Sequence, residues 1–243
     1  SREATRAHTE YMLARLHSEI PDFRPSALKY FYACSYEVQG SIWTPGLPAE
    51  FRRRRGYDMT PYLPVLAGAV VGSEDHSERF RVDYRRTVAE LFIESFYQAG
   101  REIANRHGLL SVGEAGGPGW PLHQVPVDAL KAQAVLDIPR GEFWHEGRVW
   151  VVKETASAAH VYGKKVVQME AFTSWRHWQD GPADLKPTAD RAFCEGANHL
   201  VWHTMPHTPP QGGKPGWVYH AGTHIGPNDP WWPMAKPFLD YLA

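Results

Sequence analysis

The feature that most constrains this fold is a recurring unit in which an apolar, strand-like run ends in a glutamate and a helical stretch or long loop follows. The unit appears four times along the 243 residues. Strands that alternate with helices run parallel in one sheet, so their carboxyl ends share one edge. The four glutamates are therefore expected at that edge. The runs are Leu28–Glu37, Leu109–Glu114, Ala134–Glu142 and Lys165–Glu170.

A fifth strand near the C-terminus completes a pattern of five strands, each followed by a helix, in a chain that begins inside a helix. A closed (β/α)8 barrel needs eight such units. The pattern predicts an α/β fold of the TIM-barrel type, with residues 1–243 as one catalytic-barrel portion that supplies roughly the last five units. The first three would be missing or on another chain. The expected strands cover 28–38, 109–113, 134–138, 165–171 and 199–203, and the main helices 1–19, 77–107, 149–162, 187–196 and 232–242.

An open doubly wound sheet of five strands is the alternative architecture. It gives no reason to place a glutamate at nearly every strand end, whereas catalysis at the carboxyl edge of a barrel does. The barrel interpretation is therefore preferred.

The charge pattern excludes several classes of partner. The net charge is −1 and the basic residues are scattered, so nothing indicates a nucleic acid or an anionic membrane. The one basic run, Arg52–Arg55, is interpreted as an ion-paired helix turn. No apolar run of about 18 residues could span a membrane, and no signal-peptide pattern opens the chain. Two cysteines, Cys34 and Cys194, are too few for a disulfide framework and are expected as free thiols.

Carboxylates gathered at one edge suit glycoside hydrolysis. That reaction uses two carboxyl groups, one to protonate the leaving oxygen and one to activate water or attack the anomeric carbon. The acid needs a pKa raised by burial or by a neighbouring carboxylate. The same cluster would also suit a hard cation such as Ca²⁺.

Tryptophans and histidines offer further candidates. Several of the ten tryptophans fall in loops, where they could stack on sugar rings or anchor a Pro/Gly-rich surface. His199, His203 and His207 are spaced by four, as are His220 and His224. Zinc uses this spacing on a helix, but the first set lies on a strand that runs into a loop. A zinc hydrolase is therefore a remote alternative, and hydrogen bonding to sugar hydroxyls or packing beside tryptophans is preferred.

Seven segments of the chain resemble glycoside hydrolase family 106, the α-L-rhamnosidases. The likeness covers nearly the whole chain and keeps the order and spacing of its blocks. The segments are SYEVQGSIWTP (35–45), EFRRRRGYDMTPYLPVLAG (50–68), DYRRTVAELFIESFY (83–97), GEFW (141–144), ASAAHVYGKKVVQMEAFTS (156–174), ADRAFCEGANHLVWHT (189–204) and THIGPNDPWW (223–232).

The resemblance implies a (β/α)8-barrel enzyme that removes terminal α-L-rhamnose with inversion of the anomeric carbon, aided by calcium. The family's general acid falls on Glu37 and its base on Glu170. Glu142 and Glu114 then become candidates for the calcium and sugar-hydroxyl shell.

The resemblance also implies a substrate pocket and a location. His203, His207 and His224 match positions that look like pocket residues, and Trp175 and Trp231 are the tryptophans expected against the sugar. The expected partner is a rhamnose-containing carbohydrate. The family's polymer substrates imply an extracellular or periplasmic enzyme.

Two departures keep a second function open. The family commonly reads Asp-Ser-Tyr-Glu where this chain has Cys34 before Ser35, Tyr36 and Glu37, so a thiol replaces a carboxylate close to the proposed acid and calcium binding is in question. Family members are also longer, with upstream barrel units and accessory β-domains that are not seen here. A non-catalytic carbohydrate-binding remnant is therefore the alternative to a glycosidase.

Overall fold

The computed structural model describes residues 1–38, 42–117, 125–147 and 150–243. Its described strands form a five-stranded sheet in the order β1-β2-β3-β4-β5, and every neighbouring pair is parallel. This confirms the predicted strand–helix rhythm. The sheet is a half-barrel, and closure into a full (β/α)8 barrel stays a prediction. The strands are β1 (Tyr30–Ala33), β2 (Leu110–Gly113), β3 (Ile138–Trp144), β4 (Gln168–Thr173) and β5 (His199–Trp202).

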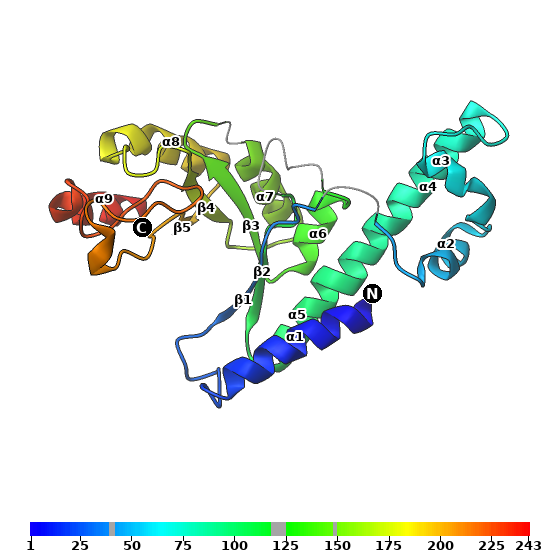
Figure 1. Ribbon diagram of the computed structural model, residues 1–243, viewed down its shortest axis with the longest axis horizontal. Helices are drawn as coiled ribbons and strands as arrows, with labels where there is room; N and C mark the ends of the chain where they lie inside the picture. Colours follow the sequence, from blue (N-terminus) through cyan, green and yellow to red (C-terminus); the bar gives the residue numbers. More distant parts are fainter. Residues whose placement is uncertain (39–41, 118–124, 148–149) are drawn as a thin grey trace.

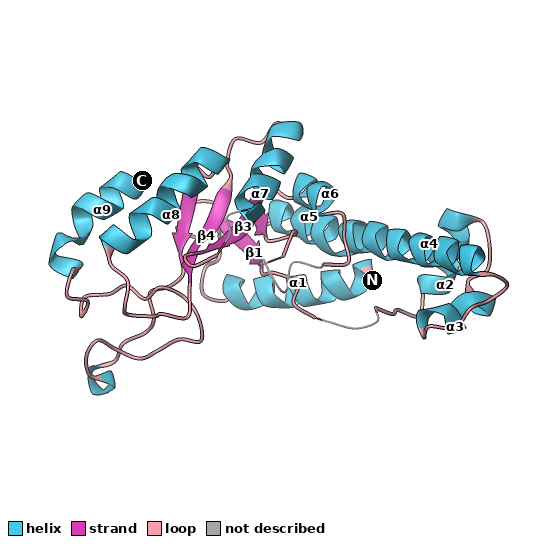
Figure 2. Cartoon of the chain, turned by 90° about the horizontal axis from the view of Figure 1, so that it is seen from above, coloured by secondary structure: helices cyan, strands magenta, loops and turns pink. Residues whose placement is uncertain are grey.

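The helices connect these strands and extend well beyond them. Figure 1 shows a long helical arm, α4, that reaches away from the sheet and carries α2 and α3 at its far end. Viewed from above, α1 lies alongside α5, while α7, α8 and α9 gather around β3 to β5 (Figure 2). The helices are α1 (Arg2–His17), α2 (Leu47–Arg55), α3 (Leu63–Leu66), α4 (Glu74–Phe92), α5 (Ala99–Arg106), α6 (Ala129–Val135), α7 (Trp150–Val161), α8 (Pro182–Glu195) and α9 (Ala235–Leu242).

The predicted strand at 134–138 was wrong in its position. Asp128 caps α6 by accepting a hydrogen bond from the Lys131 amide at 3.2 Å, and the helix continues to Val135. Its alanine-rich sequence favours the helix. The strand starts only at Ile138 and runs on to Trp144, so Glu142 lies inside β3 rather than after it. Glu170 likewise occupies the third position of β4, not its end.

The first strand and the long helix also differ from expectation. β1 stops at Ala33, so Glu37 lies in the loop that follows. Ser73 caps α4 by accepting from the His76 amide, and a π-helical turn at Ile93–Gln98 joins α4 to α5. The expected single helix is therefore continuous but contains a widened segment.

Separate apolar clusters support the sheet and the arm. The arm has its own core around Phe51, Met59 and Phe80. There Arg54 reaches Glu90 at 3.2 Å and Glu94 at 2.5 Å, which confirms the ion-paired interpretation of the basic run. The main core lies between β3 to β5 and the helices α7 to α9. Its largest buried side chains are Phe143, Met169, Phe172 and Leu185.

Two further sequence expectations concern the cysteines and membrane-spanning helices. Cys34 and Cys194 are both exposed and free. Among the described helices, none is long and apolar enough to cross a membrane.

Candidate active site

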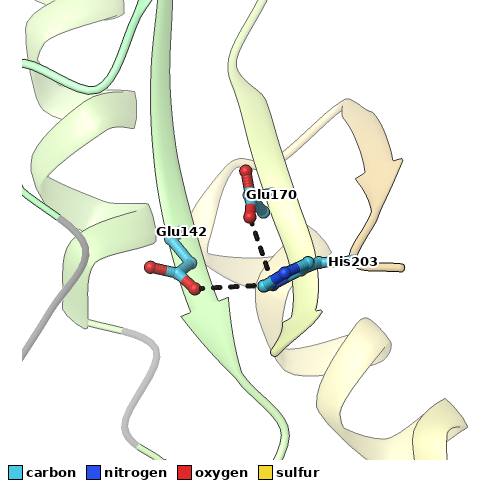
Figure 3. Close-up of side chains that lie close together, drawn as sticks. All are labelled: Glu142, Glu170 and His203. Carbon is cyan, nitrogen blue, oxygen red and sulfur yellow. Dashed lines mark ion pairs between the residues drawn. The ribbon is translucent and has the colours of Figure 1, made fainter. Parts of the chain in front are cut away.

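Two carboxylates and one imidazole converge on the sheet. Glu142 and Glu170 are register partners on β3 and β4, so their side chains leave the same face. His203 follows directly after β5, and Figure 3 shows the three side chains pointing toward one another. The Nδ1 atom of His203 lies 3.1 Å from Oε1 of Glu170 and 4.0 Å from Oε1 of Glu142. Three adjacent strands thus build one polar group.

The hydrogen bonds around His203 define its tautomer. The Thr173 hydroxyl donates to Glu142, so its oxygen is an acceptor for His203 Nδ1 at 3.0 Å. Glu170 offers a second acceptor to the same nitrogen. Nδ1 must therefore carry the proton. Burial lowers the pKa of His203, against the raising effect of the Glu170 charge, so the ring stays neutral and Nε2 is left as an acceptor.

Glu142 has the electrostatics of a proton donor. The side chain is buried, and burial raises its pKa to about 7. The charges of Glu170 and Glu37 raise the pKa further, whereas the hydrogen bond from Thr173 opposes them. Near neutral pH a substantial fraction of Glu142 therefore carries a proton.

Arg140, two residues before Glu142 on the same strand face, was not predicted. One terminal nitrogen of its guanidinium donates to Oε2 of Glu170, and the other donates to Oε1 of Gln168 at 3.2 Å. Its Nε lies 3.0 Å from Glu114 without the geometry of a hydrogen bond, so that contact is an electrostatic one. Arg140 therefore contacts one oxygen of Glu170 and one oxygen of Glu114, and it bridges the two carboxylates.

Glu114 is buried beside this arginine. The Tyr32 hydroxyl donates to it from β1, and the Arg140 guanidinium lies over the Tyr32 ring at 4.3 Å. Burial and the charge of Glu170 raise the pKa of Glu114, while Tyr32 and Arg140 oppose them. Tyr32 and Arg140 both contact its Oε1 atom, and Glu114 is not in the described group of side chains that could hold a metal ion.

The fit of the site to calcium is partial. Within the described ranges, one group of three side chains could hold a metal ion, namely Glu142, Glu170 and His203, whose ligand atoms lie within 4.8 Å of one another. Calcium favours six to eight oxygen ligands, and an imidazole nitrogen is a softer donor. Of the two predicted ligands, Glu142 belongs to this group and Glu114 does not. Calcium stays a prediction.

Glu37 lies at the exposed edge of the site. Ser35 donates a 2.6 Å hydrogen bond to its carboxylate, and its charge contributes to the raised pKa of Glu142. Cys34 lies in the same loop. Burial and then the charge of Glu114 raise the pKa of its thiol. The cysteine is therefore a neutral group in this loop.

The predicted pocket histidines have different surroundings. His207 is exposed, with its ring 6.3 Å from that of Trp217. His224 is fully buried, and its Nε2 accepts a hydrogen bond from the Tyr219 amide at 3.0 Å. Burial lowers the pKa of His224 to about 4, helped by His177. It is a neutral ring held by the backbone.

The two predicted tryptophans also differ. Trp175 is 53% exposed and its ring lies 5.2 Å from that of Trp144, which forms an aromatic surface open to a sugar. Trp231 is half-buried and packs with Trp202 and Phe238 against the main core. Its contacts are those of packing, and a role in substrate binding stays a prediction.

A sequence signal for the missed residues did exist. Arg140 is a charged residue inside an otherwise apolar segment, at an even spacing from Glu142. Gln168 has the same spacing from Glu170. Alternation along a strand places each pair on one face. The signal at Arg140 was concealed because the third strand was expected at 134–138, which leaves Arg140 outside it.

We expect Glu142→Gln to alter the pH dependence of stability, measured by urea unfolding in EDTA. The folded pKa of about 7 lies above the ordinary 4.5. The carboxyl's stabilising contribution is thus fully present below pH 4.5 and is lost as the pH rises through 7. Glutamine can accept from Thr173 without ionising, so the variant should exceed the wild type at pH 8 by roughly 2 kcal/mol.

The matched control is Glu146→Gln, since the Glu146 side chain is 48% exposed and keeps its hydration in the folded state. Parallel stability curves for the wild type and Glu142→Gln would contradict the charge assignment at Glu142.

The chain is similar to known proteins in sequence and in fold. The profile of the family Glyco_hydro_106, described as alpha-L-rhamnosidase, matches residues 1–243. A rhamnosidase from Novosphingobium sp. PP1Y has a similar solved structure, with a TM-score of 0.86 and 32% identity, covering 100% of this chain and 24% of that one. A Formosa agariphila protein named putative beta-glucuronidase is 38% identical over 213 residues, 86% of this chain and 18% of its own length. The chain spans less than a quarter of either relative, and it belongs to glycoside hydrolase family 106.

Proposed function

We propose that the protein is a glycosidase that removes terminal α-L-rhamnose from a polysaccharide or glycoside. The observation that supports this most is the convergence of Glu142, Glu170 and His203 on one face of the sheet. Hydrolysis of a glycosidic bond needs carboxyl groups in different protonation states, and Glu142 and Glu170 have different surroundings. Glu170 is ion-paired with Arg140. Glu142 is buried, and Arg140 is not among its described partners. Family membership supplies the sugar.

In the proposed mechanism Glu170 is the base. Arg140 holds one of its oxygens, and the carboxylate would accept a proton from the attacking water. Glu37 is proposed as the acid that protonates the leaving oxygen, from the exposed edge where a leaving group could enter. Water attack on the face opposite the leaving group would invert the anomeric carbon.

The neutral rings around the site are proposed to bind the sugar. His203 presents Nε2 as an acceptor for a hydroxyl group, and the exposed ring of Trp175 offers a stacking surface. His207, His224 and Trp231 stay candidates for the pocket. A polymeric substrate would be met outside the cytoplasm, which makes an extracellular or periplasmic location part of the proposal.

Calcium is proposed with Glu142 as the described carboxylate best placed to bind it. A bound cation would supply positive charge for orienting sugar hydroxyl groups. Cys34, which stands where the family commonly has an aspartate, removes one hard oxygen donor from the neighbourhood of Glu37. The same substitution motivates the alternative function, a domain that binds rhamnose-containing carbohydrate without cleaving it.

We expect Glu170→Gln to lower kcat by about 10²- to 10⁴-fold on α-L-rhamnosides with any leaving group, because water activation is always required. Glu37→Gln should lower kcat strongly for a poor alkyl leaving group and little for dinitrophenol, which leaves without protonation. The measurement is kcat across a series of aryl and alkyl rhamnosides, with circular dichroism to verify the fold.

The control is Glu146→Gln, an exposed carboxylate outside the group. If Glu37→Gln were equally slow with every leaving group, Glu37 would not be the acid, and Glu142 with its raised pKa would replace it. Wild-type rates in Glu170→Gln would end the assignment of the base.

The stereochemistry of release is a separate prediction. Inversion should yield the β-anomer of rhamnose first, before mutarotation mixes the anomers. Proton NMR during the first turnovers detects which anomer appears. Initial α-anomer would mean retention through a covalent intermediate, with a carboxylate as nucleophile.

The calcium prediction is tested by hydrolysis of an aryl α-L-rhamnoside with and without EDTA, in the wild type and in Cys34→Asp. We expect EDTA to lower the rate, and Cys34→Asp to bind calcium more tightly because a carboxylate adds a hard oxygen ligand. Calorimetry with Ca²⁺ measures the affinity directly. Hydrolysis that ignores EDTA would remove calcium from the proposal, and rhamnoside binding without turnover would favour the binding alternative.

A further inference from the structure

We infer that Arg140 is a positioning residue that fixes the orientation of the Glu170 carboxylate; this inference rests on the proposed role of Glu170 as base. The Arg140 side chain is more buried than that of Glu170, and its action is through Glu170.

The three nitrogen atoms of Arg140 face three different side chains. They contact Glu170, Gln168 and Glu114, which come from β4 and from the end of β2. The guanidinium is planar and its nitrogen atoms are fixed relative to one another. Its position is therefore determined from two strands at once, and the direction in which it donates to Glu170 is determined with it.

Gln133 and Tyr32 also hold the arginine in place. The fully buried side chain of Gln133 on α6 donates to the Arg140 carbonyl at 2.8 Å and accepts from its amide at 3.2 Å. The Tyr32 ring covers the guanidinium from the other side. Only 8% of the Arg140 side chain is exposed, so it has little freedom to follow a moving partner. This is the arrangement expected of a group that orients another.

Glu170 needs such a group because each of its two oxygens has one described polar partner. Arg140 binds Oε2, and His203 approaches Oε1 at 3.1 Å. With both contacts the carboxylate plane is fixed. Without Arg140 only His203 would restrain Glu170, whose side chain is 19% exposed and could turn toward solvent. A misplaced base costs rate more than affinity, because alignment matters most in the transition state.

A lysine cannot replace this arginine. Its single ammonium could pair with Glu170 or with Glu114 but lacks the planar fork that reaches both together with Gln168. Arg140→Lys therefore keeps the charge and tests orientation, whereas Arg140→Ala removes both. If the alanine variant fails to fold because the buried Glu114 and the half-buried Glu170 lose their counter-charge, the lysine variant still decides the matter.

The experiment measures kcat and KM for an aryl α-L-rhamnoside in the active enzyme and the two variants. We expect kcat to fall about 10²-fold in Arg140→Lys, with KM changed only a few-fold. Millimolar guanidinium should restore part of kcat in Arg140→Ala, and urea, which has the same shape without the charge, should not. The matched control is Arg101→Lys, since Arg101 pairs with Asp137 at 2.7 Å outside the carboxylate group and should keep wild-type kcat.

A second readout does not depend on turnover. ¹⁵N-histidine NMR reports the Nδ1–H of His203, which lies against Glu170. We expect this resonance to shift or broaden in Arg140→Lys and to be unchanged in Arg101→Lys. An unchanged resonance, or a wild-type kcat in Arg140→Lys alongside an inactive Glu170→Gln, would overturn the inference while the proposed function stands. A wild type that does not hydrolyse rhamnosides would instead overturn the proposed function, and the NMR comparison would then decide on Arg140.

Discussion

Arg140 carries the positive charge that lets Glu114 and Glu170 lie together on the interior face of the sheet. A buried carboxylate without a partner is strongly destabilising, and two of them side by side repel each other as well. The guanidinium contacts both, and Tyr32 adds a hydrogen bond to Glu114. These contacts offset part of the cost of burying Glu114, whose pKa nevertheless stays raised. The remainder of the site is arranged around this ion pair.

The network crosses the whole sheet through neighbouring side chains. Tyr32 on β1 contacts Glu114 after β2, which contacts Arg140 on β3; Arg140 contacts Glu170 on β4, and Glu170 contacts His203 after β5. Each link joins adjacent parallel strands. Parallel pairing sets the strands at a constant spacing, so a long polar side chain from one strand reaches a side chain on the next. The register of the sheet therefore controls the charge distribution of the site.

Glu142 differs from the other two because Arg140 is not among its described partners. Hydrogen bonds from Thr173 and Trp144 partly offset its burial, and the charges of Glu170 and Glu37 add to the cost of ionisation. Burial and these charges raise the pKa of Glu142, as burial and the Glu170 charge raise that of Glu114 even beside Arg140. Glu142 and Glu170, which are register partners, thus have unlike surroundings, and acid–base chemistry relies on such differences between neighbouring carboxyl groups.

The sequence alone determined the strand–helix alternation, the parallel order of the sheet and the gathering of Glu114, Glu142 and Glu170, because alternation and apolar periodicity are local properties. It could not locate β3, since an apolar run of this length is compatible with α6 as well. The tertiary structure was needed to show that Glu170 pairs with Arg140, that Glu142 is buried without Arg140 among its described partners, and that Glu37 is exposed. Those differences arise from contacts between residues far apart in the chain, such as Tyr32 with Glu114 and Arg140 with Glu170. Their energies depend on distances and burial that no local pattern encodes.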